Sequence, residues 1–267
     1  MSHQALVPPF DKTFKLADYD PAHTGDQDKE QALADITTLR LRLNELQDVL
    51  YADRRFGLLV ILQGIDAAGK DGTVKSVFQE VGPLGCDVVS FGVPTAEEAA
   101  HDFLWRYHVH APERGKVMIF NRSYYESVLV ERVDSLVPKE TWKARYDEIN
   151  RFERFLSDEG TVIMKFFLHI SKEEQRERLQ DRIDDPNKRW KFRSGDLDER
   201  KSWDGYQEAF EDMVAKCNTD HAPWHVVPGD HKWHRDVVVA QALIERLEGL
   251  KLRYPQPEAG IEGMRVE

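Results

Sequence analysis

An apolar run that ends in a glycine-rich loop is the feature that most constrains this fold. The stretch LLVILQGIDAAGKDG at 58–72 contains Gly64, Gly69 and Lys70 at the spacing G-x-x-x-x-G-K. Between a strand and a helix, this spacing is typical of a phosphate-binding loop, whose backbone N–H groups point at phosphate oxygens beside a helix N-terminus. We predict that Lys70 neutralises a transferring phosphoryl group. The alternative is a tight turn without a ligand.

Two acidic residues set this loop apart from the usual pattern. A Ser or Thr that ligates magnesium normally follows the lysine, but this chain has Asp71 there. Asp66 lies inside the loop, where a carboxylate would repel phosphate unless it holds a metal ion. We predict that Asp66 ligates magnesium, with a turn or capping role as the alternative. Asp71 either contributes to the site or only favours the helix dipole.

Apolar strands alternate with helices along most of the chain. Strands are predicted at 56–63, 86–92, 116–120, 162–170 and 224–228, and helices at 27–53, 70–81, 95–108, 139–158, 171–183 and 233–250. Three helix starts carry a capping pattern: Thr95 with Glu98, Ser123 with Glu126, and Ser171 with Glu174. Continuous apolar strands between helices predict an α/β fold, with a parallel sheet that helices cover on both faces.

The same patterns divide the chain into three parts. Residues 1–54 form an irregular arm and a helix, 55–250 form the main domain, and 251–267 form a tail. The first helix carries a narrow apolar stripe made of Ile36, Leu39, Leu43, Leu46 and Leu50. This stripe packs either on its own domain or on a second subunit, and a homo-oligomer is therefore predicted.

Composition argues against several functional classes. A net charge of −11 argues against general nucleic-acid binding, since affinity for polyanions comes from a positive field. No apolar run approaches the roughly 18 residues that span a bilayer, and the N-terminus shows no export signal. Cys86 and Cys217 have neither disulfide nor metal-ligand spacing. We expect a cytoplasmic protein that binds neither nucleic acid nor membrane.

A second polar cluster follows the strand at 116–120. Asn121 stands where P-loop enzymes often carry an acidic magnesium ligand, and we predict it near the metal or a phosphate. Arg122 is predicted to bind phosphate through its planar fork, unless it only forms a surface ion pair. Glu126 either joins the nucleotide site or serves the capping box. Phosphate or nucleotide contacts are thus predicted for Gly64, Ala67, Ala68, Gly69, Lys70, Asp71, Gly72, Thr73 and Glu126.

A charged segment, DDPNKRWKFRSGDLDERKS at 184–202, interrupts the alternation of strands and helices. Its composition is too irregular for a core element, and we expect a mobile cover, or lid, over the site. Arg178 and Arg182 precede it four residues apart, so they share one helix face and are predicted to close on a phosphoryl group. A solvated charged face is the alternative.

Four blocks, in this order and spacing, resemble the type-2 polyphosphate kinase family. They are GIDAAGKDGT at 64–73, FNRSYYESVLVERV at 120–133, EQRERLQDRIDDPNKRWKFRSGDLDER at 174–200 and APWHVVPGDHKWHR at 222–235. The resemblance covers about 30–250 and implies a P-loop kinase fold related to thymidylate kinases. It implies phosphoryl transfer between inorganic polyphosphate and nucleotides (AMP, ADP and ATP), with Mg²⁺, or Mn²⁺ in its place.

The resemblance also implies roles for individual residues. Together with the reasoning above, it gives six predicted catalytic residues, Asp66, Lys70, Asn121, Arg122, Arg178 and Arg182, with Asp66 and Asn121 as metal ligands. Many members have aspartate at the position of Asn121, and asparagine suggests the subgroup that converts AMP to ADP and ADP to ATP. An ATP-dependent nucleoside monophosphate kinase and a non-catalytic nucleotide-binding regulator remain as alternatives.

Overall fold

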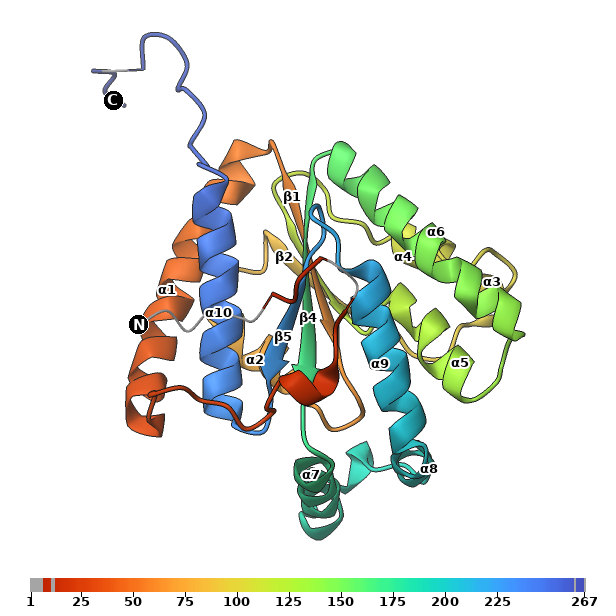
Figure 1. Cartoon of the computed structure of the whole chain (residues 1–267). Helices are drawn as coiled ribbons and strands as arrows, with labels where there is room; N and C mark the ends of the chain where they lie inside the picture. Colours follow the sequence, from red (N-terminus) through yellow and green to blue (C-terminus); the bar gives the residue numbers. More distant parts are fainter. Residues whose placement is uncertain (1–6, 11–12, 262, 267) are drawn as a thin grey trace.

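A parallel sheet of five strands forms the centre of the molecule. The computed structural model describes residues 7–10, 13–261 and 263–266. The strand order is β2-β3-β1-β4-β5, and every neighbouring pair is parallel (Figure 1). The strands are β1 (Gly57–Gln63), β2 (Cys86–Ser90), β3 (Val117–Asn121), β4 (Thr161–His169) and β5 (Trp224–Pro228). The predicted α/β fold and all five predicted strands are therefore confirmed.

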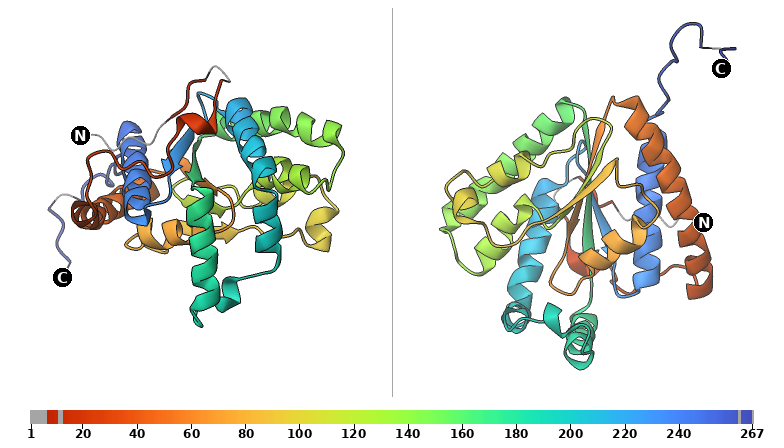
Figure 2. Two further views of the ribbon diagram at one scale, coloured as in Figure 1. Left: turned by 60° about the horizontal axis from the view of Figure 1, so that its bottom comes forward. Right: turned by 180° about the vertical axis from the view of Figure 1, so that it is seen from behind.

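Helices cover both faces of this sheet (Figures 1 and 2). One face carries α1 (Lys29–Asp53), α2 (Lys70–Val77) and α10 (Lys232–Gly249), and the other carries α6 (Lys139–Asp158) and α9 (Trp203–Cys217). The short helices α3 (Ala96–Ala99), α4 (Trp105–His108) and α5 (Val130–Val133) lie on the α6 side. Because both faces are covered, every residue of β1 and β5 is buried. Among the helices that the structure describes, none is both long and apolar enough to span a bilayer.

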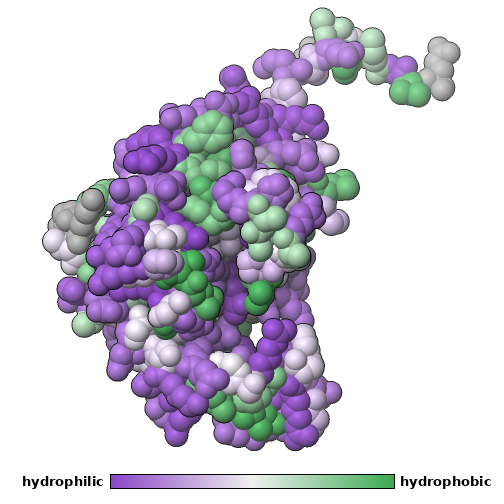
Figure 3. All heavy atoms as spheres, turned by 90° about the vertical axis from the view of Figure 1, so that its right-hand side faces the viewer, coloured by the Kyte–Doolittle hydropathy of each residue, from purple (hydrophilic) through white to green (hydrophobic). Residues whose placement is uncertain are grey.

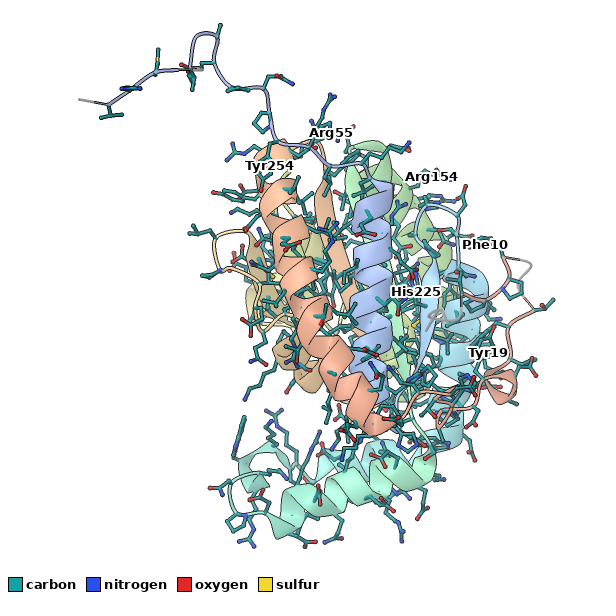
Figure 4. The ribbon with its side chains drawn as sticks, turned by 90° about the vertical axis from the view of Figure 1, so that its left-hand side faces the viewer. Phe10, Tyr19, Arg55, Arg154, His225 and Tyr254 are labelled. Atoms are coloured by element: carbon teal, nitrogen blue, oxygen red, sulfur yellow. The ribbon has the colours of Figure 1, made fainter. Side chains whose placement is uncertain are left out.

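The apolar stripe of the first helix is buried within its own chain. Ile36, Leu43 and Leu50 of α1 belong to the core. The helix lies against α10 along most of its length, as Figure 4 shows. At the surface of this helix pair, Arg42 Nη2 donates to Glu248 Oε1 at 2.9 Å. Packing on the same domain is therefore the correct alternative for this stripe, and self-association would need another surface.

The N-terminal arm joins α9 to α1 across the loop after β5. Part of the predicted arm, residues 1–6 and 11–12, lies outside the described residues. Leu16 is buried, and its N–H donates to Glu211 Oε1 of α9 at 2.9 Å. The N–H of Asp230, just after β5, donates to the carbonyl oxygen of Pro21 at 3.1 Å. The described arm is irregular, as predicted, apart from a 3₁₀ turn at Leu16–Asp18.

The predicted helix at 95–108 is interrupted. Its capping box is present, since Thr95 and Glu98 exchange backbone-to-side-chain hydrogen bonds of 2.7 and 3.2 Å. However, the Asp102 carboxylate accepts hydrogen bonds from the N–H groups of Leu104 and Trp105, at 3.0 and 3.1 Å. This local bonding competes with a continuous helix and starts the separate turn α4.

The other two capping predictions have different outcomes. Ser171 caps α7 (Lys172–Asp184), because its hydroxyl oxygen accepts the Glu174 N–H at 3.1 Å. The capping box at Ser123 is wrong. Ser123 accepts from the N–H of Tyr125 and opens a 3₁₀ helix, Tyr124–Val128. The Glu126 carboxylate is therefore available for another contact, described below.

The lid at 184–202 is more regular than its composition suggests. It contains a 3₁₀ turn, Arg189–Lys191, and α8 (Gly195–Lys201), which lie below the sheet in Figure 1. In α8, Asp196 and Asp198 stand in the first turn, and Arg200 and Lys201 stand in the last turn. This order of charges favours the helix dipole. The expectation of an irregular segment is therefore wrong for about half of its length.

Candidate active site

A strongly basic cavity lies at the carboxyl edge of the sheet. Its volume is about 650 Å³, between the P-loop, α7, the lid and the start of α10. Figure 3 shows the hollow that separates the lid from the body of the molecule. Nine basic residues line the cavity: Lys70, Arg122, Arg178, Arg182, Lys188, Lys191, Arg193, Lys232 and Arg235. Only four lining residues are acidic: Asp66, Asp71, Asp181 and Asp196. A chain of net charge −11 thus concentrates positive charge at one place.

The P-loop has a conformation that its glycines and one alanine permit. Gly69 has a φ of 104°, and Ala67 has a φ of 68°, which is rare for a residue with a side chain. Lys70 is buried at the start of α2, and its Nζ donates to the carbonyl oxygens of Gly64 and Ile65 at 2.5 and 3.2 Å. Burial lowers the pKa of Lys70, helped by the charge of Arg122. The lysine is therefore held inside the loop that it would serve.

Asp66 and Arg122 form an ion pair beside Lys70. Burial opposes the charged form of Asp66, but Lys70, Arg122 and Arg182 outweigh it and lower the Asp66 pKa to about 2. Arg122 has a φ of 63°, and its N–H donates to the Leu62 carbonyl oxygen at 3.1 Å, which extends the pairing of β3 with β1. The sheet thus holds a strained residue where its guanidinium meets the P-loop aspartate.

Asn121 and Asp71 contact each other across the cavity floor. The Asn121 Nδ2 atom donates to Asp71 Oδ1 at 2.6 Å. Because the amide nitrogen is engaged, the amide oxygen remains as the acceptor available to a metal ion or its hydration shell. An aspartate in place of Asn121 would set two carboxylates against each other. Asp71 therefore does more than favour the dipole of α2.

A second, acidic cavity lies on the other side of the Asp66–Arg122 pair. Its volume is about 450 Å³. Six acidic residues line it, Asp66, Glu126, Asp134, Asp196, Asp198 and Glu199, together with the apolar or aromatic residues Ile65, Leu129, Val130, Tyr206 and Phe210. The Glu126 carboxylate faces it and accepts a hydrogen bond from Gln63 Nε2 at 3.0 Å. The sequence patterns gave no sign of this cavity, because its wall comes from α5, α8 and α9.

Glu199 of the lid is a site residue that sequence reasoning missed. The backbone N–H of Asp66 donates to Glu199 Oε1 at 2.7 Å. Burial and the nearby charge of Asp66 raise the pKa of Glu199 to about 8. The lid therefore contacts the P-loop directly in this conformation, through a carboxyl group whose charged form is disfavoured by burial and by Asp66.

The two arginines of α7 differ in what they bind. Arg178 is buried and donates to the carbonyl oxygens of Ala67 and Ala68 in the P-loop, at 3.0 and 2.8 Å. It also donates to the Gly229 carbonyl oxygen at 2.6 Å. Arg182 donates to Asp196 Oδ2 of the lid at 3.1 Å. Arg178 thus supports the loop, whereas Arg182 connects α7 to the lid.

The remaining predicted residues have mixed placements. Ala67, Gly69 and Gly72 line the basic cavity, and Gly64 lines the acidic one. Thr73 is fully buried, and its hydroxyl donates to the Gly69 carbonyl oxygen at 3.2 Å, so its side chain supports the loop. Ala68 is also fully buried.

The oxygen ligands at the site suit magnesium only with help from a substrate. Among the described residues, no group of three or more His, Cys, Asp or Glu side chains is arranged to hold a metal ion. Magnesium in phosphoryl-transfer sites is usually held by one or two carboxylates, substrate phosphates and water. Asp66, with the amide oxygen of Asn121, fits that donor set.

Comparison with known proteins agrees with this geometry. The family model of polyphosphate kinase 2 matches residues 26–255. An AMP/ADP-polyphosphate phosphotransferase of Meiothermus ruber is 51% identical over 96% of this chain and 97% of its own. An ADP-polyphosphate phosphotransferase of Rhodopseudomonas palustris is 45% identical over 80% of this chain and 78% of its own. The crystal structure of polyphosphate kinase 2 from Arthrobacter aurescens TC1 superposes with a TM-score of 0.91 at 41% identity, covering 94% of this chain and 90% of that one.

Proposed function

The chain belongs to the polyphosphate kinase 2 family, and from this premise we propose that it transfers phosphoryl groups from inorganic polyphosphate to AMP and ADP. The observation that carries the proposal is the meeting of two cavities of opposite charge at Asp66 and Arg122, beside Lys70. Phosphoryl transfer from one phosphate compound to another needs two binding sites that meet where the phosphoryl group is transferred. The relative from Meiothermus ruber is named for both acceptors, which supports AMP as well as ADP.

The basic cavity is the site proposed for the polyphosphate donor. Polyphosphate carries roughly one negative charge per phosphate and needs many cations along its length, which the lid and α10 supply. The acidic cavity is proposed for the acceptor. Its aromatic and aliphatic side chains suit a nucleoside, and its acidic rim would exclude a second polyphosphate chain.

The transfer is a direct in-line displacement. A terminal phosphate oxygen of the acceptor forms a bond to the terminal phosphorus of polyphosphate, and the bridging P–O bond behind that phosphorus breaks. The products are a nucleotide with one more phosphate and a polyphosphate chain with one fewer. The acceptor oxygen is already ionised, so no general base is needed. Lys70, Arg122 and Arg182 stabilise the charge on the moving group.

Magnesium is proposed as the cofactor, held by Asp66 and the amide oxygen of Asn121 together with phosphate oxygens. When bound, it would neutralise phosphate charge and orient the two substrates. Because the Asp66 pKa is about 2, this carboxylate is ionised over the whole working pH range and ready to bind a cation. The test is Asp66→Asn, which we expect to raise the Mg²⁺ concentration needed for half-maximal rate by at least about tenfold. An unchanged Mg²⁺ requirement would exclude Asp66 as a ligand.

The lid is proposed to exclude water, which competes with the nucleotide as acceptor. Its contacts with the rest of the site are polar: Glu199 with the Asp66 N–H, and Asp196 with Arg182. Such contacts break and re-form at little cost, as a lid requires.

The decisive experiment supplies polyphosphate and AMP, or polyphosphate and ADP, with no ATP, and measures ATP by luciferase. We expect ATP from both acceptors, and none from Lys70→Ala purified in the same way, which controls for contaminating kinases. If ATP must be added before AMP is phosphorylated, the protein is an ATP-dependent nucleoside monophosphate kinase. If nucleotide binds without turnover under any condition, the protein is a regulator.

Self-association and a cytoplasmic location are also proposed. Size-exclusion chromatography with light scattering tests the self-association.

A further inference from the structure

We propose that Arg235 is a contact for the polyphosphate donor and that Asp236 is the residue that positions it. The proposal rests on the function proposed above. The sequence patterns gave neither residue a role, although the block at 222–235 ends at Arg235. Both residues follow β5, about 165 residues after the P-loop, near the start of α10. Arg235 lines the basic cavity although its side chain is almost entirely buried.

The Arg235 guanidinium lies directly on the P-loop. A Cβ atom built on Gly69 would lie 2.1 Å from Arg235 Nη1, and one built on Gly72 would lie 3.4 Å from Nη2. Gly69 is therefore required twice, once for its positive φ and once for the space that the guanidinium occupies. Since the loop directs its N–H groups at phosphate, a cation at this distance from the loop backbone would face the same phosphates.

Asp236 fixes the orientation of this guanidinium. Arg235 Nε and Nη2 both donate to Asp236 Oδ1, at 2.8 and 2.6 Å. These two bonds occupy one edge of the planar group and leave Nη1 on the side of Gly69. Asp236 is itself buried, and burial raises its pKa, whereas Arg235, Ser76 and Arg40 favour its charged form. Arg40 Nη2 donates to Ser76 Oγ at 2.7 Å, so α1 and α2 both support the pair.

Arg178 lines the same cavity as Arg235 but has different hydrogen-bond partners. Its guanidinium donates to backbone carbonyl oxygens of the P-loop and of Gly229, as described above, and to Glu174 Oε1 at 2.6 Å. Arg235 lines the same cavity, and its guanidinium pairs with one carboxylate, that of Asp236. The geometry thus gives the two buried arginines of this cavity different tasks.

The test measures KM for polyphosphate, KM for ADP and kcat in four variants: Arg235→Ala, Arg235→Lys, Asp236→Asn and the double variant Arg235→Ala/Asp236→Asn. We expect Arg235→Ala to raise KM for polyphosphate at least about tenfold, with KM for ADP within about twofold. Arg235→Lys keeps the charge but cannot keep the planar fork, and we expect it to rescue only part of the loss.

Asp236→Asn gives the sharpest result, because a charge effect and a positioning effect predict opposite changes in KM for polyphosphate. It removes a negative charge next to a polyanion site, so charge alone would lower KM for polyphosphate. Loss of positioning would raise that KM, by about fivefold in our expectation, and would add little to Arg235→Ala in the double variant. Arg42→Ala is the control, since it breaks an ion pair between α1 and α10 away from the cavity. It should leave both KM values unchanged.

Three results would overturn the proposal while the wild type still makes ATP from polyphosphate. They are an unchanged KM in Arg235→Ala, a lowered KM in Asp236→Asn, and equal rises in KM for both substrates. Melting temperatures of all variants, measured in parallel, separate loss of fold from loss of contact, and Asp236→Asn keeps one acceptor for Arg235 if a larger change unfolds the protein. If the wild type makes no ATP from polyphosphate, the proposed function fails instead.

Discussion

The two cavities that flank Asp66 and Arg122 differ in the charge of their lining residues and in the elements that supply them. The basic one draws its cations from α7, the lid and α10, whereas the acidic one draws carboxylates and apolar side chains from α5, α8 and α9. The two share only Asp66, Arg122, Arg193 and Asp196. Charge is thus sorted between two sides of one loop, in agreement with the proposed binding of polyphosphate on one side and of the nucleotide on the other.

The largest expected effect on activity comes from replacing Arg122, because its side chain lines both cavities. In Arg122→Ala, we expect kcat/KM to fall at least about 100-fold with either acceptor, as it does when a group that stabilises the transition state is removed. Steady-state rates at varied polyphosphate and varied ADP would measure this. A change of less than about twofold would show that Arg122 only pairs with Asp66.

A smaller effect, limited to one side, is expected from the cations of the lid. Lys188→Ala combined with Lys191→Ala should raise KM for polyphosphate up to about tenfold and leave KM for ADP unchanged, since both line only the basic cavity. The loss should shrink as salt rises, because exposed charges are screened. If KM for ADP rose equally, the two cavities would not be separate binding sites for the two substrates.

Asn121, which lines only the basic cavity, tests whether that cavity influences acceptor choice. Asn121→Asp replaces a hydrogen bond to Asp71 with a contact between two carboxylates, and adds a negative charge to the wall of the basic cavity, where the transferring phosphoryl group is proposed to lie. We expect the ratio of kcat/KM for AMP to that for ADP to change by about three- to tenfold. An unchanged ratio would remove Asn121 from the account of acceptor choice.

The smallest effect is expected from Glu199, as a change in stability with pH. Its folded-state pKa of about 8 lies above the ordinary 4.5, so the folded protein binds the proton more tightly than the unfolded chain does. Stability should therefore fall as pH rises from about 5 to 8. In Glu199→Gln, the free energy of unfolding should decrease over this pH range by about 1–2 kcal/mol less than in the wild type, as measured by urea unfolding without Mg²⁺. Equal pH profiles for the two proteins would contradict the assignment.

The fold was largely predictable because its signals are local. A continuous apolar strand such as β1, next to a glycine-rich turn and a helix start, needs no distant contact to be recognised. Two predictions failed for local reasons. The Asp102 carboxylate starts a new turn within the helix predicted at 95–108, and the order of charges in α8 favours a helix where composition indicated none. The burial of α1 against α10 could not be chosen over a subunit contact, since both use the same stripe.

The candidate site was predictable only where one motif contained it. Asp66, Lys70 and Arg122 follow directly from strands β1 and β3, which parallel pairing brings together. Glu199 and Arg235 reach the same loop from 133 and about 165 residues away, so their contacts could not be read from the sequence, although both lie in the blocks that carry the family resemblance. Arg178 and Arg182 look equivalent in sequence, and only their partners distinguish a support for the loop from a link to the lid.

The left-handed backbone of Arg122 has a practical consequence for protein engineering. A residue with a side chain at a φ of 63° costs the fold about 1 kcal/mol relative to glycine. Glycine would relieve that strain but would also remove the cation that pairs with Asp66, so selection for heat resistance and selection for turnover need not favour the same residue at this position. A screen for a more durable ATP-regenerating catalyst should score turnover and melting temperature in the same round, or keep position 122 out of the library.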